Sequence, residues 1–177
     1  MVGLRQRLLS AKIGRSQLFT DRLVSPFRQR SITRHWYKTR NMTFTLYALL
    51  SEASPPMTVE TLETQLSTFF RNDSALRIQR ERLPFSRADS LALWWGNWLV
   101  RIAYEEGAQV EEESFEISKR VGNAAPFDLS GIYRRVRVVF GADDARETTN
   151  EIIYVIDFLK EVPGVAIFDL LQNDFLE

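Results

Sequence analysis

The clearest alternation of apolar and polar positions in the chain lies in the stretch Ser90–Glu106. Apolar side chains recur at every second position from Trp98 to Tyr104, and this period of two predicts a β-strand with one buried face. Gly96-Asn97 interrupts the pattern, either as the turn of a hairpin or as a bulge within one long strand, and we favour the hairpin. Other segments must therefore cover the apolar face of this strand.

Four further segments have the pattern of strands. Thr43–Leu50 and Arg134–Phe140 alternate as half-buried strands do, and Leu76–Gln79 alternates over a shorter length. We expect this short strand at an edge of the sheet, and Pro84 closes it. Val165–Asp169 is nearly all apolar, which indicates a strand in the interior of the sheet.

Three segments have helical spacing instead. The first follows Thr58, a residue that caps helices, and places apolar side chains on one side from Val59 to Phe70. The second, Val110–Val121, has acids early and bases late, as the helix dipole favours. The third, Thr148–Glu161, has the strongest apolar stripe and ends before Pro163-Gly164.

This order of elements predicts an α+β fold: an antiparallel or mixed sheet with about three helices packed mainly on one face. The chain has 177 residues, of which 45% are hydrophobic, and this is enough for one core. We therefore divide it into a basic N-terminal arm, residues 1–41, and a single α+β domain, residues 42–177.

The net charge of zero conceals a strong asymmetry between these two parts. Residues 1–41 carry ten Lys/Arg and one acid, so they sum to +9, whereas residues 42–177 sum to −9. Four interpretations of the arm stay open. It is translated sequence upstream of a natural start at Met42, an organelle transit peptide, a segment that binds nucleic acid or an anionic surface, or a segment that folds onto the acidic body.

Few residues are available for catalysis or metal binding. The chain has no cysteine and one histidine, His35, so disulfides, thiolate metal sites and a cysteine nucleophile are excluded. It also contains no glycine-rich phosphate loop and none of the common hydrolase or metalloprotease motifs. We expect no cofactor and no metal ion. No apolar run approaches the roughly 18 residues that cross a membrane, so we expect a cytoplasmic protein without a membrane partner.

Carboxylates and tryptophans are the candidates for binding. Six acids lie within twelve residues of sequence: Glu105, Glu106, Glu111, Glu112, Glu113 and Glu116. They form a solvated face, a patch that steers a basic partner, or a carboxylate pair for acid–base chemistry. Trp94 and Trp95 are consecutive in a strand and must point to opposite faces, so we expect one of them to be accessible as an interface anchor. These eight residues are the predicted partner-binding site.

The order of the segments GNWLVRIAYEE, EEESFEISKRV, RRVRVVFGADD and TNEIIYVIDFLKEVPGVAIFD resembles small cytosolic α+β proteins of bacteria. Some of these are uncharacterised, and others are immunity proteins of toxin systems. The likeness covers residues 90–177 and includes no diagnostic motif. It implies an acidic, cysteine-poor inhibitor that binds a cognate toxin.

The leading hypothesis is therefore a non-enzymatic protein-binding module of the immunity or inhibitor type, which occludes a basic partner. One alternative is a small-ligand binder or an enzyme that uses carboxylates. Another is an accessory subunit whose N-terminal arm is a targeting signal. We expect nucleic acid to bind only through residues 1–41, and self-association into a homo-oligomer is compatible with the sequence.

Overall fold

The computed structural model describes residues 43–82, 89–143 and 146–177, all of which belong to one compact unit, Thr39–Glu177. The predicted arm, residues 1–41, lies outside the described residues. Along the chain the elements are β1 (Phe44–Leu50), α2 (Val59–Phe69), β2 (Leu76–Glu81), β3 (Ser90–Trp95), β4 (Trp98–Glu106), α3 (Ala108–Val121), the 3-10 turn η1 (Gly122–Ala124), β5 (Arg134–Phe140), α4 (Thr149–Lys160), β6 (Val165–Asp169) and β7 (Asp174–Phe175).

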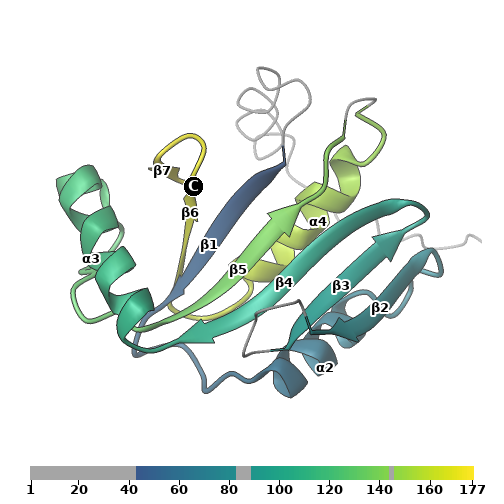
Figure 1. The fold of residues 1–177 in the computed structure, drawn as a ribbon, viewed down its shortest axis with the longest axis horizontal. Coiled ribbons are helices and arrows are strands. Elements are labelled where there is room, and N and C mark those ends of the chain that lie inside the picture. The colour runs from purple at the N-terminus through teal and green to yellow at the C-terminus, as the bar shows by residue number, and fades with distance from the viewer. Residues whose placement is uncertain (1–42, 83–88, 144–145) are drawn as a thin grey trace, which may run out of the picture. The chain divides into compact units, whose positions relative to one another are not determined.

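The strands form one sheet in the order β2-β3-β4-β5-β1-β6-β7, and every pair is antiparallel (Figure 1). The α+β fold is confirmed. The predicted hairpin is confirmed as well: Trp95 pairs with Trp98, and Gly96 between them has a φ of 60° that suits glycine. As predicted, the short strand β2 lies at an edge.

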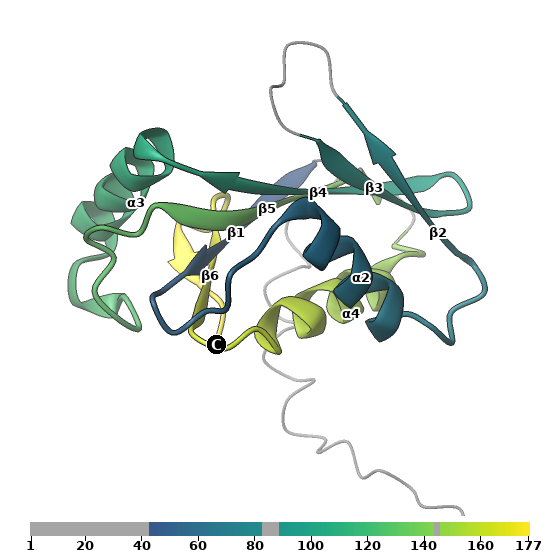
Figure 2. The same ribbon diagram turned by 90° about the horizontal axis from the view of Figure 1, so that it is seen from below.

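Helices α2 and α4 cover one face of the sheet, which we call the covered face (Figure 2). Its strand residues are apolar and buried; Leu46, Leu93, Val100, Val138 and Phe140 each have none of their surface exposed. Leu62 and Leu66 of α2 and Val155 and Leu159 of α4 are equally buried. Burial of this apolar surface is the main source of stability for the fold.

Helix α2 begins at the predicted cap. The Thr58 hydroxyl accepts a hydrogen bond from the backbone N–H of Thr61 at 3.2 Å, and the Thr61 hydroxyl accepts one from the N–H of Thr58 at 2.8 Å. This reciprocal arrangement satisfies two N–H groups that the first helical turn leaves without partners.

Helix α3 lies against the opposite face, which we call the open face, so two of the three helices share the covered face. Ile117 of α3 packs on Leu49 and Phe168 of the sheet and on Leu129 and Ile132 of the segment before β5. The helix occupies one end of the sheet (Figures 1 and 2). Beyond it the open face carries partly accessible residues of β1, β4 and β5, among them Thr45, Leu99, Arg101, Arg137 and Val139.

Candidate functional site on helix α3 and the open face

The two consecutive tryptophans point to opposite faces, as predicted. Trp95 lies on the covered face with 8% of its surface exposed, and its indole N–H donates to Asp73 Oδ2 at 2.8 Å. Trp94 lies on the open face and is half-buried, with the Arg77 guanidinium carbon 5.9 Å from the centre of its ring. Of the two, only Trp94 therefore shares a face of the sheet with α3.

The six glutamates of the acidic run have different surroundings, and a buried arginine divides them. Arg135 of β5 has 4% of its side chain exposed and donates to Glu105 Oε2 at 2.7 Å and to Glu113 Oε2 at 2.6 Å. Arg137 forms an ion pair with the other oxygen of Glu105, with its Nε 3.0 Å from Oε1. These two carboxylates, one from β4 and one from α3, therefore meet between the helix and the sheet and are paired with cations.

Below this ion-pair cluster lies the ring of Tyr47, whose centre is 3.8 Å from the Arg135 guanidinium carbon. A guanidinium stacked on an aromatic face and bound by two carboxylates has little freedom to reorient. Because Glu113 belongs to α3 and Arg135 to β5, the contact fastens the helix to the sheet. We call Tyr47, Glu105, Glu113 and Arg135 the arginine clamp.

The environment of the clamp also sets the protonation of Glu113. Burial raises the pKa of this carboxyl, but hydrogen bonds from Arg135 and Gln109, together with the charge of Arg135, outweigh burial and leave its pKa below the ordinary value. Glu113 is therefore ionised at neutral pH and remains paired with Arg135.

The remaining acids of α3 point to solvent. Val110, Ser114 and Ile117 face inward, so the spacing of the helix places Glu111, Glu112 and Phe115 on its outward side. Phe115 is 48% exposed, and neither Glu111 nor Glu112 has an ion pair with another described residue. We call these three residues, with Glu116 and Lys119, the outer face of α3.

One lysine balances part of this charge. Lys119 pairs with Glu116 at 2.8 Å, and its ammonium lies 4.1 Å from the centre of the Phe115 ring. A surface pair of this kind contributes little and exchanges partners easily. The outer face thus presents an accessible aromatic ring beside two carboxylates that remain free to meet a cation.

Glu106 is separated from the outer face, because it ends β4 on the side of the sheet opposite Glu105. It accepts a hydrogen bond from the Tyr104 hydroxyl at 2.7 Å. The pKa of Tyr104 is raised, mainly by the burial of its hydroxyl and secondly by this hydrogen bond. The structure therefore brings Glu105 and Glu113 together at Arg135. It places Glu111, Glu112 and Glu116 together on the outer face of α3. Glu106 and Trp95 belong to neither group.

Two residues of this site were absent from the predicted set. Phe115 could have been found, since the inward positions Val110, Ser114 and Ile117 leave it on the outward side of the helix. Arg135 could not, because only the pairing of β4 with β5 places it opposite Glu105.

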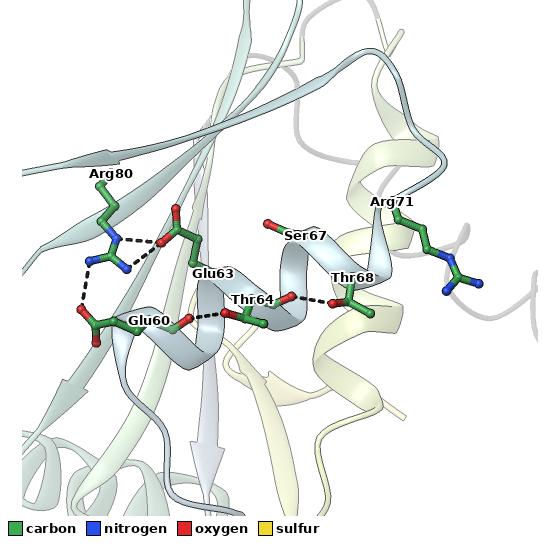
Figure 3. A pocket seen from close by; sticks show the side chains of 7 residues that line it. All are labelled: Glu60, Glu63, Thr64, Ser67, Thr68, Arg71 and Arg80. Carbon is green, nitrogen blue, oxygen red and sulfur yellow. Dashed lines mark hydrogen bonds and ion pairs between the residues drawn. The ribbon is translucent and has the colours of Figure 1, made fainter.

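A shallow pocket of about 540 Å³ lies apart from this site, between α2 and β2 (Figure 3). Arg80 of β2 lies at one end of it and donates to Glu60 Oε1 at 2.9 Å and to Glu63 Oε2 at 2.7 Å. Arg71 lines its other end and forms no ion pair with a described residue.

Within the described ranges, no group of three or more histidine, aspartate or glutamate side chains is arranged to hold a metal ion. In the same part of the chain, no helix combines the length and the apolar character needed to cross a membrane.

Comparison with known proteins gives no relationship from which a function could be carried over. No family model, no curated protein and no solved structure matches the chain at a significant level.

Proposed function

We propose that this protein is a non-enzymatic binding module of the immunity or inhibitor type, and that it presents the outer face of α3 to a basic partner protein. The observation that carries the proposal is Phe115, which is 48% exposed beside Glu111 and Glu112. An accessible aromatic ring among acids combines an anchor that becomes buried with charges that attract a basic surface.

The arginine clamp supports this proposal. Binding costs less free energy when the binding surface is already ordered. Arg135 joins α3 to the sheet through Glu113, and Ile117 packs under the helix, so the outer face is held on a fixed frame. The negative charge of residues 42–177 adds a long-range attraction for a cationic protein, strongest at low salt.

The carboxylate-enzyme alternative has less support from the same geometry. A general acid needs a carboxyl whose pKa is raised. Among the predicted acids, Glu105 and Glu113 converge on one place, but both bind the Arg135 guanidinium, and the pKa of Glu113 is lowered. This pair therefore has the surroundings of a structural ion pair.

The experiment is affinity capture from lysate of the source cells, with the full-length chain as bait at low and at moderate salt. Bound proteins are quantified by mass spectrometry. We expect one dominant, basic partner in near-stoichiometric amount, and we expect the double variant Glu111→Lys/Glu112→Lys to retain less than about a tenth of it.

The matched control is Asp157→Lys/Glu161→Lys, which makes the same change of charge at two exposed positions at the C-terminal end of α4 and just beyond it. The control should capture nearly as much partner as the wild type. Equal loss in both variants would mean that only net charge matters. No partner at either salt would overturn the proposal.

A further inference from the structure

We propose a second binding surface, independent of α3: the outer edge of β2, which pairs with no further described strand, accepts an extended segment of a partner protein as an additional antiparallel strand. The groove between β2 and α2 would hold the side chains of that segment. Addition of a strand at a sheet edge uses backbone hydrogen bonds for affinity and an adjacent groove for specificity.

The two edges of the sheet differ in what they offer. At one edge β7 has two residues, Asp174–Phe175, which is too short to template another strand. At the other, β2 has six residues, and its outward backbone groups make no backbone hydrogen bond to any described residue. An edge of this length is open to pairing unless side chains protect it.

Charged side chains on an edge strand usually hinder pairing with a further strand. In β2, however, the charged side chains interact with residues on the two faces of the sheet. Arg80 turns to Glu60 and Glu63 of α2 on the covered face. On the open face Glu81 accepts from Arg101 at 2.5 Å, and Arg77 lies over Trp94. None of these three contacts involves the outward N–H and C=O groups of β2.

The groove lies directly beside this edge. Its α2 wall carries the hydroxyls of Thr64, Ser67 and Thr68, and Arg80 forms the β2 side (Figure 3). The Thr64 and Thr68 hydroxyls donate to helix carbonyls at 2.9 and 2.8 Å, which leaves their lone pairs free to accept. The groove thus suits polar side chains that project from every second residue of an added strand.

The charges of the groove define the partner segment. Glu60 and Glu63 face one cation, Arg80, so that end has a surplus negative charge, while Arg71 at the other end forms no ion pair with a described residue. A partner strand added antiparallel to β2 begins beside Arg80 and ends beside Leu76, four residues away. The matching segment therefore has a basic residue followed, four positions later, by an acidic one.

The probe is the blocked peptide Thr-Lys-Val-Ser-Val-Glu-Thr, added to the ¹⁵N-labelled full-length chain and followed by NMR. Its lysine, serine and glutamate project to one side, as the groove requires. We expect the largest shifts at the amides of β2 and α2, with slower hydrogen exchange at outward amides of β2. The peptide with lysine and glutamate exchanged should bind about ten-fold more weakly.

Two matched experiments complete the test. N-methylation of the alternate peptide amides that face β2 should abolish binding. In the variant Glu60→Lys/Glu63→Lys, the preference between the two peptides should be reversed. Glu111→Lys/Glu112→Lys should leave peptide binding unchanged, so a failure here is separate from a failure of the α3 proposal. No shift at β2 with millimolar peptide, or shifts centred elsewhere, would overturn the inference.

Discussion

The two faces of the sheet hold their helices by different means. On the covered face α2 and α4 pack through apolar side chains such as Leu93 and Phe140, which are fully buried. On the open face α3 combines a small apolar cluster with the charged arginine clamp. Apolar packing does not depend on the charge of any side chain, whereas a buried arginine destabilises the fold when its partner carboxylates are removed. The comparison shows that acids adjacent in sequence have separate roles, Glu113 in attachment and Glu111 and Glu112 in contact with solvent.

The largest expected effect is on the covered face. Phe140→Ala should lower the free energy of unfolding by about 3–5 kcal/mol, because it leaves a cavity among buried side chains. Chemical denaturation at neutral pH measures this loss. A loss below about 1 kcal/mol would contradict the central place given to this face.

Removal of the arginine of the clamp comes next. Arg135→Met should cost about 2 kcal/mol, because it removes the common cation of Glu105 and Glu113, while partial exposure and the pairing of Glu105 with Arg137 reduce the loss. The control is Arg101→Met on the same face, whose side chain is 40% exposed and pairs with Glu81. The control should cost at most about 1 kcal/mol. Equal losses in the two variants would show that the clamp has no special role.

Glu113→Gln sharpens the comparison, because it removes one charge and keeps the shape. We expect a loss of about 0.5–1 kcal/mol at neutral pH, since the carboxylate is 36% exposed and water weakens the pair. Hydrogen exchange should quicken along α3 but not along α4. Equal acceleration in both helices would contradict separate attachment.

The pH dependence of that variant follows from the lowered pKa of Glu113. The folded state holds the ionised form more tightly than the unfolded state does, so the stabilisation is present above the ordinary pKa of about 4.3 and is lost as the pH falls through the folded pKa. The difference in unfolding free energy between wild type and Glu113→Gln should therefore shrink as the pH falls below that value. A difference that stays constant down to pH 2 would contradict the ion pair.

The smallest effect is expected on the outer face. Glu111→Gln/Glu112→Gln should change the unfolding free energy by less than about 0.5 kcal/mol, because neither acid has an ion pair with a described residue. Chemical denaturation beside the wild type checks this. A larger loss of unfolding free energy would show that these acids contribute to the stability of the fold.

Much of the fold followed from local patterns. The alternation around Trp98, the cap at Thr58 and the stop at Pro163-Gly164 each act over a few residues, so the sequence alone identified the corresponding elements. The sheet order could not be obtained this way, because β1 pairs with β5 and β6 across long sequence separations. For this reason the sequence also left open whether the sheet was antiparallel or mixed.

The candidate site was predictable in composition but not in arrangement. The acidic run and the opposite directions of Trp94 and Trp95 are local features. The division of the run depends on Arg135, which lies opposite Glu105 only after β4 and β5 pair. Counting charges along a helix therefore overestimates the acids that are available to a partner.

The association rate of the captured partner tests the central claim most directly. It should be measured against salt for the wild type, for Glu111→Lys/Glu112→Lys and for the α4 control Asp157→Lys/Glu161→Lys. We predict that the α3 variant slows association at low salt by at least about ten-fold more than the control does, and that the difference narrows as salt rises. Equal association rates for the two variants at every salt concentration would contradict the assignment of the outer face of α3 as the binding surface.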